Sequence, residues 1–447
     1  MASDADRMAE HDRAVARLNL VLFSPLAPSS AIGRVSRLVV DALLEDDHDV
    51  VLVRSEDERL LRVEPVPVRV PVLEWTSRRA VRGAAEAADA VVYQVGNNFE
   101  FHRGCLEWLP QLPGLVALHD FFLGGLFHSW AQRHRSEADS ILRTWYGADV
   151  AATYFAFEGQ AFVDATADEA PMTEWIAAMS QGVIAHSSWG MARVLAACPG
   201  PVRSVPLPYD APALPPLSSR DAPRDGAAFN VLTIGHINQN KRVESVIRAI
   251  GESEELRSAS IYRLVGRIEP AMAEALDTLA RESGVRLVIS GEVAGDVLRE
   301  AIAESDVLCS LRLPALESAS ASTIEAMLYG KAVVVIDTAF YRELPDDVVR
   351  KVSPHHEIDD LRRALEALRR DPDARSALGR AAQAWAANTF RADRYARSLV
   401  EIATEAAVSD PAVTAGRYFA DTLVRWGAPV DWPMTHEIAD PLRILAG

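Results

Sequence analysis

Residues 316–337 read LESASASTIEAMLYGKAVVVID and contain two glutamates eight positions apart, Glu317 and Glu325. An apolar helical stretch begins near Glu325, ends at Gly330 and leads directly into a strand rich in valine and isoleucine. A helix followed at once by a buried strand is typical of a parallel sheet covered by helices. The stretch therefore indicates an α/β fold, and its two carboxylates are the first candidate site residues.

The same alternation of strands and helices extends along the chain on both sides of this stretch. Helical patterns cover 34–47, 121–179, 243–252, 358–371 and 376–390, and strand-like apolar runs lie at 18–23, 50–53, 90–93, 115–118, 183–185, 230–234, 261–266, 285–290 and 307–310. A proline-rich stretch at 206–226 interrupts the pattern near its middle, as a linker does. We therefore expect two α/β domains of similar size.

The domain boundaries follow from these interruptions. We expect an N-terminal extension at 1–17, a first domain at 18–205, a linker at 206–226, a second domain at 227–408 and a tail at 409–447. The tail carries Trp426 and Trp432, which need burial, and we expect it to cross back and pack on the first domain. Ligands of open α/β sheets bind beyond the carboxyl ends of the strands, so the natural site is the cleft between the domains.

Composition excludes several classes of function. The chain of 447 residues is 49% hydrophobic and 24% charged, as soluble globular proteins are. It has no apolar run long enough to span a membrane, and its first 17 residues lack the apolar core of a secretory signal, so we expect a cytoplasmic protein. Its three scattered cysteines indicate neither disulfides nor zinc. The net charge of −17 argues against nucleic acid but permits a small phosphorylated ligand in a locally basic pocket.

The loop GHINQNKR (235–242) follows a predicted strand and precedes a helix. Only three lysines occur in this arginine-rich chain, and one of them, Lys241, lies here beside Arg242. A compact ammonium fits between phosphate oxygens where a planar guanidinium does not. Together with the backbone N–H groups of a helix N-terminus, the pair predicts an anion site.

The two glutamates have different explanations. Ser322 and Glu325 have the S-x-x-E spacing of a capping box, with Ser322 as N-cap and Gly330 as the C-terminal stop. That accounts for Glu325 without a ligand and leaves Glu317 unexplained. The small residues after Glu317 let a ligand approach the backbone closely, and N–H groups before a helix can bind an anion or a sugar hydroxyl.

Two further segments belong to the predicted cleft. His119 ends a strand and precedes Asp120 and two phenylalanines, a position where a histidine can serve a site or only the core. The loop SPLAPSSAIG, which ends at Gly33, opens a helix but lacks the G-x-G-x-x-G of dinucleotide-binding proteins. The acidic run 45–49 is typical of a solvated turn and not of a metal site.

Together these segments resemble the retaining GT-B glycosyltransferases of family 4. SPLAPSSAIG (24–33), LHD (118–120), GHINQNKR (235–242) and the E-x7-E pair followed by AMLYGKAVVVID occur in the family's order, over nearly the whole chain. The E-x7-E stretch is the most specific of them. The resemblance implies two Rossmann-like domains that face each other across a cleft, with 18–205 on the acceptor side and 227–408 binding a nucleotide-sugar donor.

The resemblance also implies a role for each candidate on the phosphate side of the donor. The loop of Gly33 approaches the diphosphate, and Gly235 and His236 belong to a second loop that binds the donor. Lys241 neutralises the leaving diphosphate, with Arg242 as a helper. His236 stands where most members have arginine, which makes one phosphate contact weaker or pH-dependent.

On the sugar side, the resemblance implies that His119 lies beside the transferred sugar. It also implies that Glu317 binds the hydroxyls of that sugar. Glu325 binds the ribose hydroxyls of the nucleotide. Backbone groups complete the pocket, at Ser318, Ala319 and Ser320 for the sugar and at Thr323 and Ile324 for phosphate. Residues 318–320 replace the commoner glycine-rich sequence, which leaves the identity of the sugar open.

The implied reaction moves a sugar from a nucleotide-diphosphate sugar to a hydroxyl acceptor with retention and needs no cofactor, metal or protein nucleophile. The acceptor is a glycan, a lipid-linked molecule or a small molecule, in bacterial polysaccharide, glycoconjugate or secondary-metabolite synthesis. The basic segment 78–82 leaves a peripheral membrane contact open. Three alternatives remain: a retaining glycosidase using both carboxylates, a nucleotide-sugar epimerase of the same shape, and a catalytically silent interaction subunit.

Overall fold

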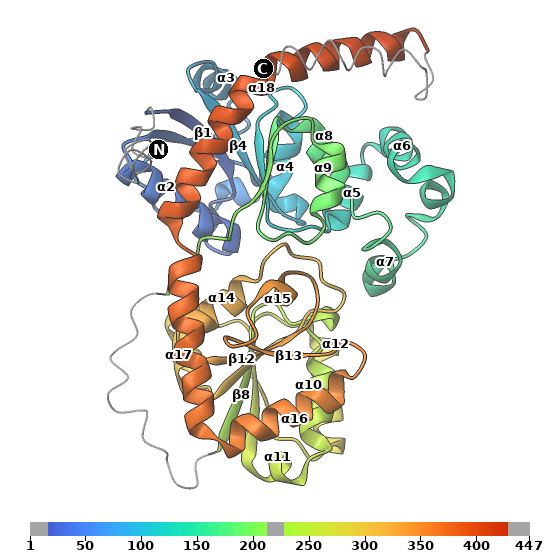
Figure 1. Ribbon diagram of the computed structural model, residues 1–447. Coiled ribbons are helices and arrows are strands. Elements are labelled where there is room, and N and C mark those ends of the chain that lie inside the picture. Colours follow the sequence, from blue (N-terminus) through green and yellow to red (C-terminus); the bar gives the residue numbers. More distant parts are fainter. Residues whose placement is uncertain (1–16, 212–227, 428–447) are drawn as a thin grey trace, which may run out of the picture.

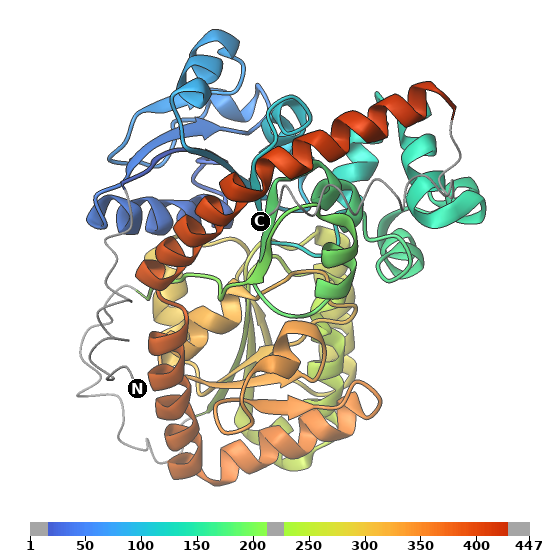
Figure 2. The same cartoon turned by 45° about the horizontal axis from the view of Figure 1, so that its top comes forward.

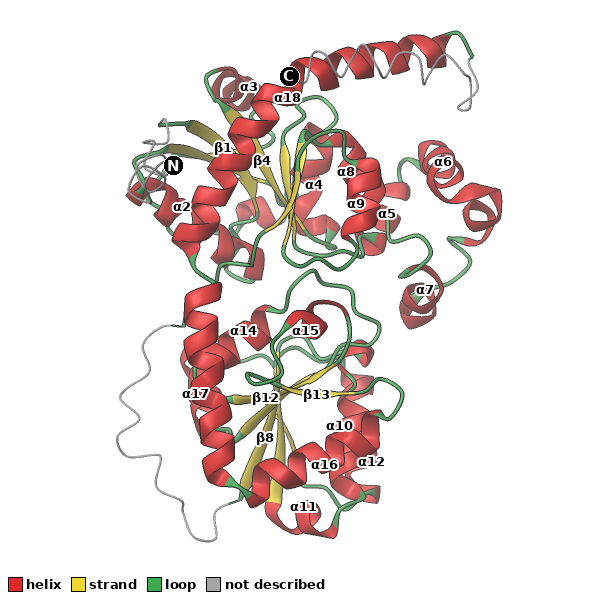
Figure 3. Ribbon diagram, in the orientation of Figure 1, coloured by secondary structure: helices red, strands yellow, loops and turns green. Residues whose placement is uncertain are grey.

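The computed structural model describes residues 17–211 and 228–427 and shows two α/β domains stacked along the long axis of the molecule (Figure 1). In each domain a central parallel sheet is covered by helices (Figure 3). The predicted extension up to residue 16, the linker from 212 onward and the tail from 428 onward lie outside the described residues. The expected two-domain α/β architecture is confirmed.

The N-terminal domain contains a seven-stranded sheet in the order β3-β2-β1-β4-β5-β6-β7. Neighbouring strands pair in parallel throughout. The strands are β1 (Asn19–Ser24), β2 (Asp49–Arg54), β3 (Val72–Glu74), β4 (Ala90–Val95), β5 (Leu115–Leu118), β6 (Gly182–Ala185) and β7 (Val202–Ser204).

Helices cover this sheet, and a helical lobe, α5 to α7, projects from its side between β5 and β6 (Figure 1). The helices are α2 (Ala31–Glu45), α3 (Arg78–Glu86), α4 (Phe99–Trp108), α5 (Gly124–Ala131), α6 (Arg135–Thr153), α7 (Gly159–Thr166), α8 (Thr173–Met179) and α9 (Met191–Ala197), with a short 3-10 helix at Leu60–Arg62.

The C-terminal domain repeats the plan with a six-stranded parallel sheet in the order β10-β9-β8-β11-β12-β13. Its strands are β8 (Phe229–Ile234), β9 (Ser260–Val265), β10 (Leu287–Ile289), β11 (Val307–Ser310), β12 (Ala332–Ile336) and β13 (Arg350–Val352). Its helices are α10 (Val243–Gly251), α11 (Glu254–Ala259), α12 (Pro270–Glu282), α13 (Gly295–Glu304), α14 (Ala321–Leu328), α15 (Ala339–Glu343), α16 (Glu357–Arg370) and α17 (Pro372–Thr389), with a 3-10 helix at Gln239–Lys241.

Both sheets reverse their strand order at one point, between β1 and β4 in the first domain and between β8 and β11 in the second. The central strands are buried on both faces, because helices cover both sides, and so they read as unbroken apolar runs such as β12, AVVVI. Ligands of open α/β sheets bind at such reversal points, beyond the carboxyl ends of the strands. The topology therefore directs attention to the loops after β8 and β11.

The last described helix, α18 (Ala392–Arg425), leaves the C-terminal domain and packs against α2 of the N-terminal domain. Figure 2 shows it running from the lower domain across the upper one. The chain thus crosses back as predicted, but the predicted boundary at 409 is wrong. The crossing begins near residue 392, because buried side chains such as Tyr395 and Leu399 already belong to the crossing helix.

The far end of α18 contradicts one expectation about the tail. Trp426 is 72% exposed, so it is not buried on the first domain as predicted, and Trp432 lies outside the described residues. No helix in 17–211 or 228–427 is both long and apolar enough to cross a bilayer.

Candidate active site

The loop after β8 presents Gly235 and His236 at the surface and buries Lys241 behind them. The Lys241 ammonium donates a hydrogen bond to the carbonyl of Ile234, at the end of β8. Gly235 has a φ of +89°, and a Cβ on it would lie 2.8 Å from the Lys241 Nζ. A side chain at position 235 would therefore both strain the backbone and displace the ammonium.

Arg312 follows β11, the neighbour of β8, and brings a second buried cation to the same reversal point. Burial lowers the pKa of Lys241 well below its usual value, and the charge of Arg312 lowers it further. Glu317 opposes both effects. Lys241 and Arg312 thus bring two basic side chains close to the Glu317 carboxylate.

The Glu317 carboxylate has defined partners on one of its oxygens. Arg312 Nε lies 3.0 Å from Glu317 Oε1, and the Tyr341 hydroxyl donates to the same oxygen at 3.0 Å. The Glu317 side chain remains 28% exposed, whereas that of Arg312 is only 6% exposed. The carboxylate is therefore held from the protein side and open toward the cleft.

The backbone around Glu317 is joined to the N-terminal domain. The N–H groups of Phe121 and Phe122 both donate to the Leu316 carbonyl at 2.9 Å, and the Ser318 N–H donates to the His119 carbonyl at 3.0 Å. The Ser318 hydroxyl donates to the Leu118 carbonyl at 2.6 Å. The structure thus joins the segments of His119 and Glu317, which belong to different domains, through backbone contacts.

His119 itself is buried beneath this contact. Its Nε2 lies 2.6 Å from the Gln94 side-chain oxygen, and its ring packs against that of His186. Burial, aided by His186, lowers the pKa of His119 well below its usual value, so the imidazole is neutral. Next to it, burial raises the pKa of Asp120 to about 7, and nearby Glu317 adds to that rise.

The segment after Glu317 corrects the predicted capping box. Helix α14 begins at Ala321, and its N-cap is Ser320, whose hydroxyl accepts a hydrogen bond from the Thr323 N–H at 3.4 Å. Ser322 lies inside the helix, because Ser320 is the residue with extended backbone, at φ −104° and ψ 103°. The predicted stop at Gly330 is confirmed, with φ +69° just beyond the helix.

This shift changes which backbone groups face the cleft. The N–H groups of Thr323 and Ile324 donate to the hydroxyl and carbonyl of Ser320, and both side chains are buried, as is Ala319. Since the first turn of a helix leaves its leading N–H groups without intrahelical partners, those of Ala321 and Ser322 are better placed for an anion than the predicted pair.

Glu325 contacts the N-terminal domain and the start of the linker instead of capping its helix. Arg34 Nη1 donates to its carboxylate at 3.2 Å, and the Tyr209 hydroxyl donates at 3.5 Å. Arg34 also pairs with Asp210 at 2.8 Å and lies over the Tyr209 ring. Burial raises the pKa of Glu325, and Arg34 counteracts that rise.

The structure does not bring Arg242 to the cleft as a helper of Lys241. Its guanidinium makes a two-pronged pair with Glu357 at 2.9 and 3.1 Å, which ties the loop to α16. Arg242 adopts φ +54°, a left-handed conformation that turns its side chain toward α16. The adjacent basic residues thus have separate tasks.

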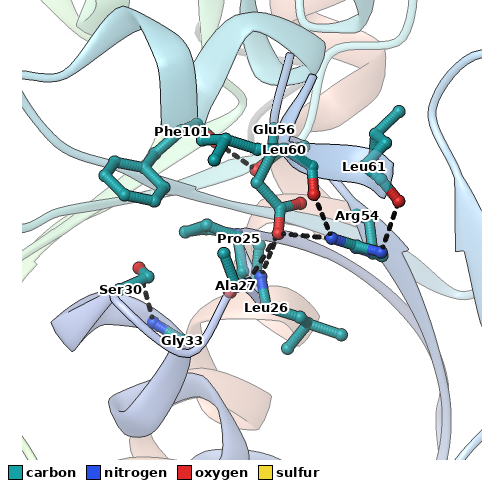
Figure 4. Close-up of polar contacts among 12 residues, drawn as sticks. Pro25, Leu26, Ala27, Ser30, Gly33, Arg54, Glu56, Leu60, Leu61 and Phe101 are labelled. Carbon is teal, nitrogen blue, oxygen red and sulfur yellow. Dashed lines mark hydrogen bonds and ion pairs between the residues drawn. The ribbon is translucent and has the colours of Figure 1, made fainter. Parts of the chain in front are cut away.

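Buried polar contacts hold the loop that ends at Gly33 (Figure 4). The N–H groups of Leu26 and Ala27 donate to buried Glu56, at 2.7 and 2.8 Å, and Glu56 pairs with Arg54. A Cβ at Gly33 would lie 2.7 Å from the Pro25 carbonyl oxygen, which explains the glycine by packing.

The sequence did not predict three residues of this arrangement: Arg312, Tyr341 and Arg34. Arg312 follows the buried run of β11, so the rule that ligands lie beyond carboxyl ends could have identified it. Nothing local in the sequence marks Tyr341, on α15, or Arg34, on α2, because both reach the site only through the fold.

Comparisons with known proteins agree with this fold. Residues 218–385 match the family described as glycosyl transferases group 1. No curated protein matched the chain. Similar solved structures include Anabaena HepE in complex with UDP and glucose, with 15% identity, a TM-score of 0.59 and coverage of 86% of this chain and 99% of that one.

Two more are sucrose-phosphate synthase from Thermosynechococcus elongatus (14% identity, TM-score 0.59, 86% of this chain and 97% of that one) and a glycosyltransferase from Rickettsia africae (13%, 0.59, 87% and 98%). At such identities the likeness shows the fold, which is GT-B. The C-terminal half carries the glycosyltransferase domain.

Proposed function

We propose that this GT-B glycosyltransferase transfers a sugar from a nucleotide-diphosphate sugar to a hydroxyl acceptor with retention of anomeric configuration. The observation that carries the proposal is the pair of buried basic side chains, Lys241 and Arg312, beside the carboxylate of Glu317 at the reversal point of the donor-side sheet. Two basic side chains gathered at one place in a protein of net charge −17 fit a diphosphate, whose charge would keep Lys241 protonated.

The chemistry of the reaction needs this distribution of charge. Breaking the bond between sugar and diphosphate leaves positive charge on the sugar ring and negative charge on the leaving group. Cations and N–H dipoles that are already in place at the diphosphate lower the barrier without reorganisation. Lys241 and the first N–H groups of α14 serve the diphosphate, and the Glu317 carboxylate lies on the sugar side.

Glu325 is the proposed ligand of the ribose hydroxyls, as the resemblance implies. In this structure its carboxylate is occupied by Arg34, so nucleotide binding has to compete with that pair or share the carboxylate with it. His119 is proposed to line the sugar pocket as a neutral imidazole, because its pKa is depressed by burial.

The finer features stay part of the proposal. A UDP-sugar donor is suggested by HepE, a structure of the same fold that was solved with UDP-glucose. Retention without metal or protein nucleophile, a glycan, lipid-linked or small-molecule acceptor, a bacterial biosynthetic role and a cytoplasmic location with optional peripheral membrane contact are predictions from the resemblance.

A thermal-shift panel of UDP, GDP, dTDP and ADP tests the donor site. We expect one nucleotide to raise the melting temperature of the wild type and to act more weakly on Lys241→Ala. The matched control is Lys351→Ala, which removes a lysine paired with Asp346 at the surface and should keep the full shift. Absence of a shift with every nucleotide would overturn the donor-site proposal and favour the silent subunit.

A product assay separates the remaining alternatives. Incubation with the matching nucleotide-sugar and EDTA should still release nucleotide in the presence of an acceptor, and proton NMR of the product should show the donor's anomeric configuration. Interconversion of the nucleotide-sugar without transfer would favour the epimerase, and an inverted product would contradict retention.

A further inference from the structure

We propose that Arg312 and Tyr341 are positioning residues for Glu317, which hold one carboxylate oxygen so that the other receives the hydroxyls of the donor sugar. The inference rests on the proposed function and specifies how the sugar half of the donor is recognised. Neither residue belongs to the E-x7-E pattern that identified Glu317.

The first support is the convergence of two donors on a single atom. Arg312 Nε and the Tyr341 hydroxyl both lie 3.0 Å from Glu317 Oε1. In the described part of the chain no side chain donates to Oε2. A glutamate on a loop would otherwise sample several rotamers, and this pair of contacts selects one in which Oε2 is the open oxygen.

The second support is that both donors are themselves fixed. Arg312 is buried, and its Nη1 donates to the Leu311 carbonyl at 2.7 Å, so the guanidinium is anchored at two points. Tyr341 is 1% exposed, and its ring packs against that of Phe340. The donors follow β11 and β12, two paired strands, so the rigid sheet sets their separation.

The third support is the way the backbone of Glu317 is held. Residues Asp120 and Glu317 form an antiparallel bridge, flanked by the hydrogen bonds of Leu316 and Ser318 to the other domain. The acceptor-side domain therefore places the backbone of Glu317, and the donor-side domain places its carboxylate. Preorganisation of this kind is what a site needs to bind a transition state more tightly than the free substrate.

A purely structural ion pair explains these facts less well. Arg312 lies close enough to Lys241 to lower the pKa of that lysine. The two basic side chains therefore repel each other when both are charged, and both are buried. An arginine kept only for stability would gain more from a site without a second cation. The contact between Arg312 Nε and Glu317 Oε1 accounts for an arginine at this position.

The test compares the affinity of each nucleotide with that of its nucleotide-sugar, by calorimetry, for UDP and UDP-glucose, GDP and GDP-mannose, dTDP and dTDP-glucose, and ADP and ADP-glucose. In the wild type one nucleotide-sugar should bind more tightly than its nucleotide. Tyr341→Phe should weaken the nucleotide-sugar about fivefold, the usual effect of one hydrogen bond, and leave the nucleotide unchanged. Arg312→Lys should weaken the nucleotide-sugar further, because an ammonium cannot hold the same two anchors.

Action through Glu317 is tested by combining variants. In a Glu317→Gln background, Tyr341→Phe should cause no further loss of affinity for the nucleotide-sugar. If Tyr341 had only a structural role, the same loss of affinity would appear in that background. Tyr262→Phe, which removes a buried hydroxyl bonded to Thr233 in the same domain, is the matched control and should leave both affinities unchanged.

The outcomes separate this inference from the function it rests on. Equal weakening of nucleotide and nucleotide-sugar by Tyr341→Phe, or additive effects with Glu317→Gln, would overturn the positioning role. A wild type that binds no nucleotide-sugar more tightly than its nucleotide would overturn it as well. Failure of all nucleotides to bind would contradict the proposed function itself.

Discussion

Replacing Arg34 by methionine probes the charged contact that joins the two domains at Glu325. Arg34 pairs with Glu325 at 3.2 Å and with Asp210 at 2.8 Å, and the Glu325 side chain is only 7% exposed. Removing one partner of a fully buried pair costs about 3–5 kcal/mol, because the other charge stays buried and unpaired. The Arg34 side chain is 29% exposed, so solvent screening reduces the expected loss to about 2–3 kcal/mol.

The pH dependence of this loss follows from the pKa of Glu325. Burial already raises that pKa above the usual range of a glutamate, and without Arg34 it rises further. A carboxyl whose folded pKa is raised destabilises the fold as pH increases through the interval between the unfolded and the folded pKa. The loss of stability in Arg34→Met should therefore be largest above that interval. It should shrink as the pH falls toward the pKa of Glu325 in the unfolded chain.

Thermal unfolding of both proteins between pH 4.5 and 8 measures the effect, with an expected drop of about 4–12 °C at pH 8 for a unit of about 200 residues. The double variant Arg34→Met/Glu325→Gln should recover much of the loss, since no charge remains buried. Arg69→Met, which breaks an exposed pair with Asp41 on α2, should change the melting temperature little. An equal deficit at pH 4.5 and pH 8, or no recovery in the double variant, would refute the reasoning.

Other substitutions test the remaining site residues. Ser320→Ala should cost about 1 kcal/mol of stability in urea unfolding, the usual value of an N-cap, whereas Ser322→Ala should cost little; the reverse order would restore the predicted capping box. Because the pKa of free Lys241 is depressed and a diphosphate would raise it, nucleotide binding should take up protons and weaken as pH rises, which calorimetry in buffers of different ionisation enthalpy detects. A carboxyl with a pKa of about 7 lowers stability as the pH rises from about 4 to 7, and Asp120→Asn should remove this decrease. An unchanged dependence of stability on pH would contradict that pKa.

The agreement between predicted and observed elements was closest where strands are fully buried. The runs 115–118 and 307–310 match β5 and β11 residue for residue, because strands covered on both faces read as unbroken apolar segments. Short strands with mixed sequences were not predicted, such as β13 (Arg350–Val352). Their assignment depends on pairing with β12, which local sequence does not reveal.

The errors in the site have a common cause. Ser322 was a plausible N-cap by spacing, but the backbone turns into the helix two residues earlier, at Ser320. Arg242 was grouped with its neighbour Lys241, yet Glu357, far along the chain, takes its guanidinium. In each case the local pattern was compatible with several partners, and a distant residue or the local path of the backbone selected one.

The sequence by itself determined the α/β class and the division into two domains, and it marked Lys241 and Glu317 as candidate site residues, because these follow from local periodicity, residue type and spacing. Only the tertiary structure decided what those residues face. In the structure Arg312 and Tyr341 both contact one oxygen of Glu317, and Arg34 pairs with Glu325. The chain returns to the first domain through α18. The reason is physical: hydrophobic patterns act over a few neighbouring residues, whereas a site is assembled from the carboxyl ends of strands that lie far apart in sequence and adjacent in the sheet.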